Sequence, residues 1–145
     1  MSVLHVIFKV AGAEYALPAS QVLHLESFLS ATKVPGAPAH VAGLMQVRGR
    51  VVPIIDLRLR FGVGAHELSP LSRVLVVQAG TRAVALLADS AREVMKIDPS
   101  DYRVAPEMMT EAGQGFVKSV AQAGGRLIML VDLPSIVGEE QVDGQ

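Results

Sequence analysis

Apolar residues along this chain occur in short runs that are rich in valine, isoleucine and leucine and are separated by glycine, proline or polar residues. Short β-branched runs with this punctuation are typical of β-strands rather than of helices. We therefore predict ten strands, five in each half of the chain: Leu4–Val10, Tyr15–Leu17, Val22–Ser27, Gly43–Val47, Val51–Ile55, Arg73–Gln78, Ala83–Ala88, Arg92–Ile97, Phe116–Gln122 and Leu127–Val131.

An internal repeat is the second feature of the pattern. The chain reads GRVVPIIDL from Gly49 and GRLIMLVDL from Gly125. Earlier segments match in the same order, at separations that grow from 68 to 72 to 76 residues: Val6–Gly12 with Val74–Gly80, Val22–Leu25 with Val94–Ile97, and Gly43 with Gly115. We predict two copies of one unit, at about residues 1–66 and 67–145, with two small insertions in turns of the second copy.

Five short strands in each half predict an all-β fold made of a pair of small barrels. A unit of about 70 residues is marginal by itself, so we expect both units to share apolar surface along a seam, where a groove is expected. Two short helices should follow the repeated Asp-Leu pairs. Asp56 is the predicted cap of a helix over Leu57–Phe61, and Asp132 the predicted cap of a C-terminal helix with Pro134 in its first turn.

Composition narrows the range of partners. Thirteen lysines and arginines against fourteen acidic residues give a net charge of −1, which argues against nucleic-acid binding. The chain has no cysteine, which fits a reducing compartment. The apolar start, Val3–Val10, is too short to span a bilayer, so we expect a cytoplasmic protein without direct membrane insertion.

Catalytic and metal-binding motifs are missing from the sequence. There is no GxSxG, P-loop, GxGxxG or HExxH pattern. The histidines, at positions 5, 24, 40 and 66, lack metal-ligand spacing and cysteine partners. We therefore predict no catalytic residue, no metal and no cofactor.

Two other polar or polarizable positions invite alternative interpretations. Asp89 interrupts an apolar run, so it is either a buried carboxylate with a raised pKa or part of an Asp89-Ser90 turn, and we favour the turn. Met108 and Met109 are either an adaptable binding surface or core residues beneath a loop, and the sequence does not choose between these.

Four arginines crowd around the central repeat: Arg48, Arg50, Arg58 and Arg60. They are either a docking surface for an acidic partner or a solvated rim. We favour the rim for Arg58 and Arg60, because single exposed charges contribute little. Arg48 lies in the turn before the repeated strand, where its guanidinium is expected to organise the bend or to form an ion pair with another strand.

The segment VPGAP and the stretch GLMQVRGRVVPIIDLRLRFG, which begins at Gly43, resemble the CheW-like coupling proteins of bacterial chemosensory arrays. The pattern of that family is a proline-containing loop, a glycine, an Asn-Leu-Arg-Gly turn and a VPI-D-LR strand. The segment Phe8–Tyr15 and the later GRLIMLVDL fit as well, so the resemblance covers almost the whole chain.

The resemblance implies a single domain of two SH3-like barrels around a shared hydrophobic core, with short helices. It implies a non-enzymatic adaptor that links the cytoplasmic tip of a methyl-accepting chemoreceptor to the regulatory domain of a CheA-type histidine kinase, at membrane-associated receptor arrays. In the family, the kinase domain meets the adaptor barrel to barrel and receptor helices bind at the groove between the subdomains.

Carried over to this chain, the receptor-binding residues lie on the third strand and around the central turn: Val22, His24, Gly43, Gln46, Arg48 and Gly49. Gln46 stands for the usual asparagine of the family. His24 stands for a glutamate that usually pairs with the arginine at Arg48. Glu26, on the same strand face, is the candidate substitute partner. His24 is then an ordinary strand residue, which we favour, or a pH-sensitive contact.

Two other classes of function are kept as alternatives. A small barrel protein that binds a metabolite or regulates another enzyme would need an apolar pocket with convergent polar groups between the subdomains. An enzyme would need a nucleophile or a metal set, which the sequence does not show.

Overall fold

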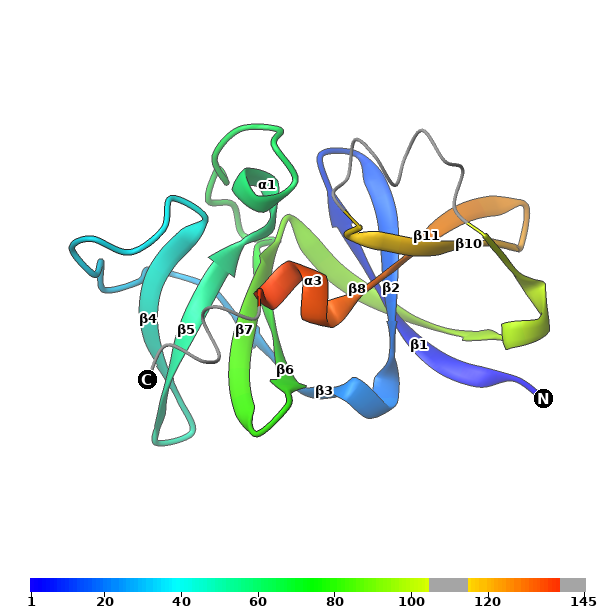
Figure 1. Ribbon diagram of the computed structural model, residues 1–145, viewed down its shortest axis with the longest axis horizontal. Helices are drawn as coiled ribbons and strands as arrows, with labels where there is room; N and C mark the ends of the chain where they lie inside the picture. The colour runs from blue at the N-terminus through cyan, green and yellow to red at the C-terminus, as the bar shows by residue number, and fades with distance from the viewer. Residues whose placement is uncertain (105–114, 139–145) are drawn as a thin grey trace.

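Strands make up most of the regular structure in the computed structural model, which describes residues 1–104 and 115–138 (Figure 1). The strands are β1 (Val3–Val10), β2 (Ala13–Pro18), β3 (Val22–Ser27), β4 (Val41–Val47), β5 (Arg50–Asp56), β6 (Arg73–Ala79), β7 (Arg82–Ala88), β8 (Ser90–Ile97), β9 (Tyr102–Val104), β10 (Val117–Ala123) and β11 (Arg126–Val131). The helices are η1 (Ala19–Gln21), α1 (Leu57–Arg60), η2 (Pro99–Asp101) and α3 (Leu133–Val137). The predicted all-β class is confirmed, while Met108 and Met109 lie outside the described residues.

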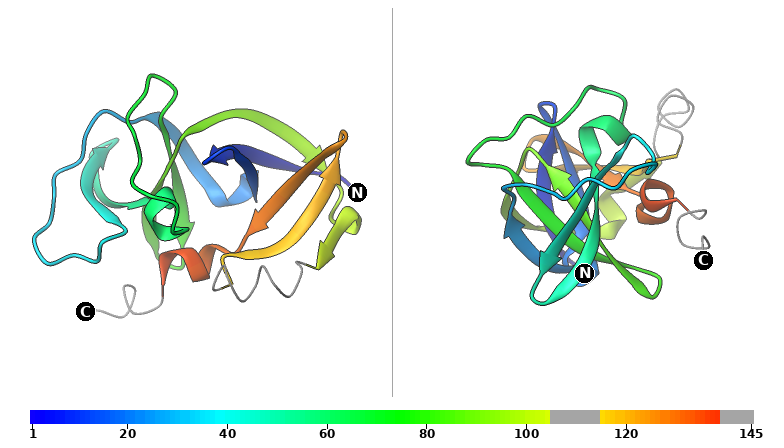
Figure 2. Two further views of the ribbon diagram at one scale, coloured as in Figure 1. Left: turned by 90° about the horizontal axis from the view of Figure 1, so that it is seen from above. Right: turned by 90° about the vertical axis from the view of Figure 1, so that its left-hand side faces the viewer.

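The strands form two sheets, which lie at opposite ends of the molecule (Figure 2). Sheet A has the order β8-β1-β2-β11-β10-β9, and sheet B has the order β3-β6-β7-β5-β4. The pairs β2 with β11 and β5 with β7 are parallel, and the other pairs are antiparallel. A division of the chain near residue 66 does not separate these sheets, because the first hairpin of each repeat joins the later strands of the other repeat.

Strand register shows how the two repeats correspond. Leu25 of β3 pairs with Leu75 of β6, and Val94 of β8 pairs with Val6 of β1. Val6 and Leu75 hold the same place in the first strands of the two repeats, and a bulge follows at the same point, so Leu25 and Val94 are equivalent. The first three strands of the repeats are therefore 69 residues apart, not 68 or 72. The expected match of Gly43 with Gly115 is also wrong, since the β4-β5 and β10-β11 pairings align Gly43 with Ser119. Apolar strands look alike in any register, whereas packing fixes which side each residue faces.

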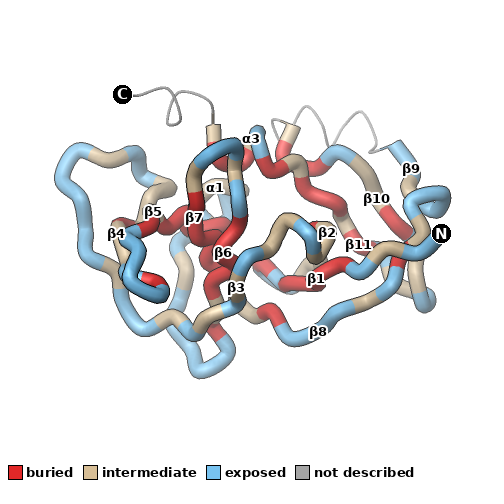
Figure 3. Tube along the Cα trace, turned by 90° about the horizontal axis from the view of Figure 1, so that it is seen from below, coloured by how far each residue is buried: buried red, intermediate tan, exposed pale blue. Residues whose placement is uncertain are grey.

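Alternate residues of the central strands face two different cores. On β6, Val74 and Val76 point into a core within sheet B, whereas Leu75 and Val77 point into a core shared by both sheets. Sheet A contributes Val6, Phe8, Val10 and Leu17 to the shared core and keeps a smaller core of its own. Buried residues accordingly concentrate where the sheets meet (Figure 3). The shared hydrophobic core predicted from the sequence is confirmed.

Both predicted helices follow the expected aspartates, but only one of these aspartates caps a helix with its side chain. Oδ1 of Asp56 accepts hydrogen bonds from the N–H groups of Arg58 at 3.0 Å and of the next residue at 3.3 Å. The Asp132 carboxylate instead accepts from the Ser135 hydroxyl, because Pro134 has no N–H at the place of Arg58. In the described part of the chain, no helix is long and apolar enough to cross a membrane.

Neither sheet closes into a hydrogen-bonded barrel within residues 1–104 and 115–138, because β3 and β4 end sheet B and β8 and β9 end sheet A. Side chains span the open sides. Arg48 of the β4-β5 turn reaches Glu26 of β3, and Arg126 of β11 reaches Glu93 of β8. The two sheets therefore fit the predicted SH3-like subdomains in an open form, in which ion pairs connect the edge strands β3 and β8 to the hairpins β4-β5 and β10-β11.

Candidate partner-binding surface

The tight turn between β4 and β5 presents Arg48 at the surface. Arg48 and Gly49 have φ values of 49° and 81°, as a two-residue hairpin turn requires. Arg48 adopts this conformation although it is uncommon for a residue with a side chain. Its Nε donates to Oε2 of Glu26 at 3.1 Å, and its side chain is 65% exposed. Among the described residues no acceptor contacts its terminal Nη groups, so these point to solvent with their donors available.

Glu26 takes the role that the family resemblance assigns to a glutamate at the position of His24, which is to pair with Arg48. His24 and Glu26 pair with Val76 and Val74 of β6, whose side chains face the core of sheet B. Directly paired residues share a sheet face, so both lie on the side from which Arg48 approaches. Glu26 forms the ion pair there, while His24 makes no hydrogen bond or ion pair within the described residues.

Gly43 is buried, and a close backbone approach requires a glycine there. Its φ is 142°, and a Cβ atom would lie 2.2 Å from the carbonyl oxygen of Thr32. Thr32 exchanges two backbone hydrogen bonds with Leu44, at 2.9 and 2.8 Å. Gly43 therefore lets residues 28–40 fasten onto β4. Its burial leaves it a role in shaping the surface rather than in touching a partner.

The other residues carried over from the family differ in exposure. Gln46 is exposed on β4, opposite the exposed Val51, and Gly49 is exposed in the turn. Val22 is half-buried and packs against the shared core. The structure thus brings Arg48, Glu26 and the inner face of β3 together, and it leaves Val22 as a packing residue at the start of that strand.

Two exposed apolar residues escaped the sequence analysis. Leu25 is 42% exposed and Val94 is 55% exposed, at equivalent places on the edge strands β3 and β8. Their paired residues, Leu75 and Val6, belong to the shared core, so both face the side of their sheets on which that core lies. An unpaired strand edge is a template for pairing with another chain, so these two edges are candidate binding surfaces. Alignment of the two repeats in the register that the structure shows would have matched Leu25 with Val94.

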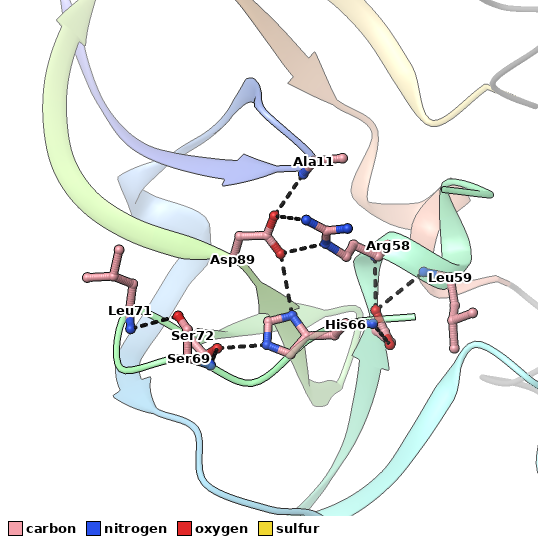
Figure 4. A network of polar contacts seen from close by, with 9 residues as sticks. Ala11, Arg58, Leu59, His66, Ser69, Leu71, Ser72 and Asp89 are labelled. Atoms are coloured by element: carbon pink, nitrogen blue, oxygen red, sulfur yellow. Dashed lines mark hydrogen bonds and ion pairs between the residues drawn. The ribbon is translucent and has the colours of Figure 1, made fainter. Parts of the chain in front are cut away.

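Asp89 lies at the bend between β7 and β8, as the favoured interpretation expected, and its carboxylate forms a bidentate ion pair with Arg58 (Figure 4). Nε and Nη2 of Arg58 donate to the two carboxylate oxygens at 2.9 Å each, and the N–H of Ala11 donates to Oδ2 at 2.8 Å. Burial raises the pKa of the Asp89 carboxyl, but these donors outweigh it and hold the pKa below its usual value. The raised pKa considered from the sequence is therefore wrong, and so is the rim assignment of Arg58.

Arg60 also contradicts the rim assignment. Its Nε donates to the carbonyl oxygen of Ile136 at 2.9 Å and its Nη2 to that of Ser135 at 3.1 Å. Its guanidinium lies over the ring of Phe116, 5.0 Å from the centroid. Successive helical residues are about 100° apart, so Arg58 and Arg60 extend to opposite sides of α1 and join it to different parts of the fold.

Ser72, His66 and Asp89 lie in the order of a hydrolase triad, but their geometry is structural. Nε2 of His66 is 2.7 Å from the Ser72 hydroxyl, whereas its Nδ1 is 3.4 Å from Asp89 without forming a hydrogen bond. Ser72 is buried and accepts a bond from the N–H of Ser69. A nucleophile must reach its substrate, and this hydroxyl does not. The three residues instead fasten the segment that follows α1.

A hollow of about 540 Å³ lies where the two sheets meet. Charged residues dominate its lining: Lys9, Glu14, Arg58, Glu67, Asp89, Arg92 and Glu93. Metabolite pockets are usually apolar with a few convergent polar groups. Four of these seven residues already take part in ion pairs with protein side chains. This hollow gives no support to the metabolite-binding alternative.

Comparison with known proteins agrees with this architecture. Residues 4–141 match the CheW-like domain. The chemotaxis protein CheW of Rhizobium meliloti (strain 1021) is 30% identical over 94% of this chain and 88% of its own length, and that of Bacillus subtilis (strain 168) is 27% identical over 93% and 86%. The crystal structure of scaffolding protein TtCheW from Thermoanaerobacter tengcongensis matches with a TM-score of 0.86 at 29% identity, over 95% of this chain and 89% of that one.

Proposed function

Because the chain belongs to the CheW-like domain family, we propose that it is a scaffold that couples methyl-accepting chemoreceptors to a CheA-type histidine kinase in a bacterial chemosensory array. The observation that carries this proposal is Arg48, which a tight turn presents at the surface and which Glu26 holds by one nitrogen only. The remaining donors of Arg48 are available to a partner. Similarity to a chemotaxis scaffolding protein over nearly the whole chain supports the same role.

On the receptor side, the surface suits an amphipathic helix. Leu25 and Val94 offer apolar contact at the edges of the shared core. On the opposite face of β3, the Nη groups of Arg48 offer hydrogen bonds to a carboxylate or carbonyl oxygen. On the kinase side, an open sheet edge suits the barrel-to-barrel contact that the family resemblance implies. Coupling then requires only that one rigid body hold both partners in a fixed geometry.

The proposed role needs no cofactor and places the protein in the cytoplasm, recruited to membrane-associated receptor arrays. Each contact is expected to be modest in strength. Repetition of the same contacts across an array would make them effective through multivalency.

Calorimetric titration tests this proposal. The protein is titrated with the regulatory domain of a CheA-type kinase and with a receptor signalling-tip fragment from the same organism. Arg48→Ala should weaken receptor binding about tenfold or more, as loss of a central arginine does. It should change the free energy of unfolding by less than about 1 kcal/mol, because its ion pair is exposed.

Arg50→Ala is the matched control, because Arg50 lies in the same hairpin, is exposed and makes no ion pair with any described residue. It should leave receptor binding nearly unchanged. Absence of saturable binding to either partner would refute the proposed function. Equal losses in both variants would refute the role of Arg48.

A further inference from the structure

Two junctions join the sheets at positions that the internal repeat relates to each other. One junction contains the ion pair of Arg58 with Asp89 and the bond from Ala11. At the other junction, Pro134 and Gly80 take the places of Arg58 and Ala11, around a hollow of about 340 Å³. Among the described residues that line this hollow, none is charged. The duplicated fold is therefore joined by charges at one junction, and the described residues form no equivalent ion pair at the other.

The charged junction connects three separate parts of the chain. Arg58 belongs to α1, which follows the last strand of the first repeat in sheet B. Ala11 belongs to the β1-β2 turn of sheet A. Asp89 is the single residue between β7 of sheet B and β8 of sheet A, where the chain crosses from one sheet to the other. One carboxylate thus holds both sheets at their crossing point (Figure 4).

The bond from Ala11 attaches a tight turn to this junction. Ala11 and Gly12 form the two-residue turn between β1 and β2, with the φ values of 52° and 84° that such a turn requires. The Ala11 N–H donates to Asp89, so this turn of sheet A is held at the junction. The side chains of Arg58 and Asp89 are only 27% and 25% exposed, so solvent screens their attraction less than that of a surface pair.

The segment after α1 is fastened to the same place. The imidazole of His66 is 5% exposed, with Nδ1 facing Asp89 and Nε2 bonded to Ser72. Its backbone N–H donates to the Asp56 carboxylate at 3.0 Å. Residues 61–72 are therefore held against the junction by contacts to two carboxylates.

We propose that the contacts of Asp89 with Arg58 and with the Ala11 N–H form a conformational lock that sets the orientation of sheet A relative to sheet B. The shared core is apolar and non-directional, so it resists separation of the sheets more strongly than small rotations. Directed hydrogen bonds supply the missing angular restraint. The equivalent junction beside α3 has Pro134 in place of the arginine, and the described residues form no such ion pair there. Arg60 ties α1 to the α3 backbone by separate hydrogen bonds.

Distance measurement between spin labels tests the lock directly. The chain has no cysteine, so single cysteines at Val51 on sheet B and Leu127 on sheet A place one label on each sheet. Both positions are 66% exposed and are equivalent in the two repeats. In Arg58→Gln and in Asp89→Asn the distribution of label distances should broaden or shift, with the far-ultraviolet circular dichroism unchanged. Arg58→Lys, which keeps the charge but loses the two-bond geometry, should lie between these variants and the parent.

Asp101→Asn is the matched control, because Asp101 is exposed and its carboxylate makes no hydrogen bond with any described residue. Its distance distribution should equal that of the parent. If Asp89→Asn does not fold, Arg58→Gln decides the test, since it leaves the bond from Ala11 in place. Distributions in folded Arg58→Gln that equal those of the parent overturn the lock.

A functional consequence follows that rests on the proposed function. If receptor and kinase domain bind to different sheets, binding of one partner changes the affinity for the other by some factor, and a rigid orientation transmits that change. In Asp89→Asn this factor should fall toward one while each separate affinity is kept. A factor unchanged from the parent overturns the consequence. The label distances need no partner, so failure of the lock is distinguished from failure of the proposed function.

Discussion

Gly43→Ala adds one methyl group where β4 meets residue 32. The new Cβ would lie 2.2 Å from the carbonyl oxygen of Thr32 and 2.8 Å from its carbonyl carbon. Both are backbone atoms, so no rotation of a side chain relieves the contact. The φ of 142° adds about 1 kcal/mol of backbone strain or more. Separating Thr32 from Leu44 loses two backbone hydrogen bonds worth about 1 kcal/mol each, so we expect a total near 3 kcal/mol.

Urea unfolding measures this cost. The midpoint should fall by roughly 1–2 M with an unchanged slope. Gly36→Ala is the matched control, because Gly36 has a φ of 81° and a Cβ there would meet no atom within 4 Å. It should show the backbone strain alone, about 1 kcal/mol. If Gly43→Ala costs no more than Gly36→Ala, the close approach to Thr32 is not what requires the glycine, and the reasoning fails.

Three further predictions concern charged residues. Burial raises the pKa of Asp89, but its hydrogen-bond donors hold that pKa below the ordinary 3.8. Ionised Asp89 therefore stabilises the fold above pH 3.8, and this stabilisation is lost as the pH falls through the lowered pKa. Asp89→Asn should therefore flatten the acid side of the stability curve measured by urea unfolding at a series of pH values, and a curve parallel to that of the parent would contradict this. Arg126→Gln should lower the urea midpoint, and more so at low salt, because Arg126 donates to two carboxylates. Arg50→Gln, at the equivalent exposed position, should leave the midpoint unchanged. Equal shifts in the two variants would argue against the ion pairs of Arg126. Asp56→Ala should cost about 1–2 kcal/mol in thermal or urea unfolding, because the Asp56 carboxylate caps its helix and also accepts a bond from the His66 N–H. Asp132→Ala should cost clearly less, because among the described residues Asp132 accepts only from the Ser135 hydroxyl, and similar costs would contradict this.

Much of the fold could be predicted because strand formation is local. Period-two runs identified strands such as Val22–Ser27, whose bounds the structure reproduces. The Asp-Leu pairs correctly marked where the two short helices begin. The short strand β9 was missed, because Tyr102–Val104 follows a proline-containing turn and gains its strand character from pairing with β10.

The candidate site was predictable only in part. The proposed pairing of Arg48 with Glu26 is present, since alternation along one strand already placed Glu26 on the same face as His24. Arg58 was assigned to a solvated rim and Asp89 to a turn, and they meet only because β8 begins immediately beside α1 and the β1-β2 turn. The sequence separates them by 31 positions and contains no local signal of their contact.

The sequence by itself determined the class of fold, the duplication and the places where strands and turns occur, because these depend on side-chain periodicity and backbone preference within a few residues. Only the tertiary structure decided that each sheet takes its first hairpin from one repeat and its later strands from the other. It also decided the register between the repeats and the junction at Asp89. These features depend on which surfaces bury the most apolar area against each other, and on charges brought together by that burial, which no local pattern encodes.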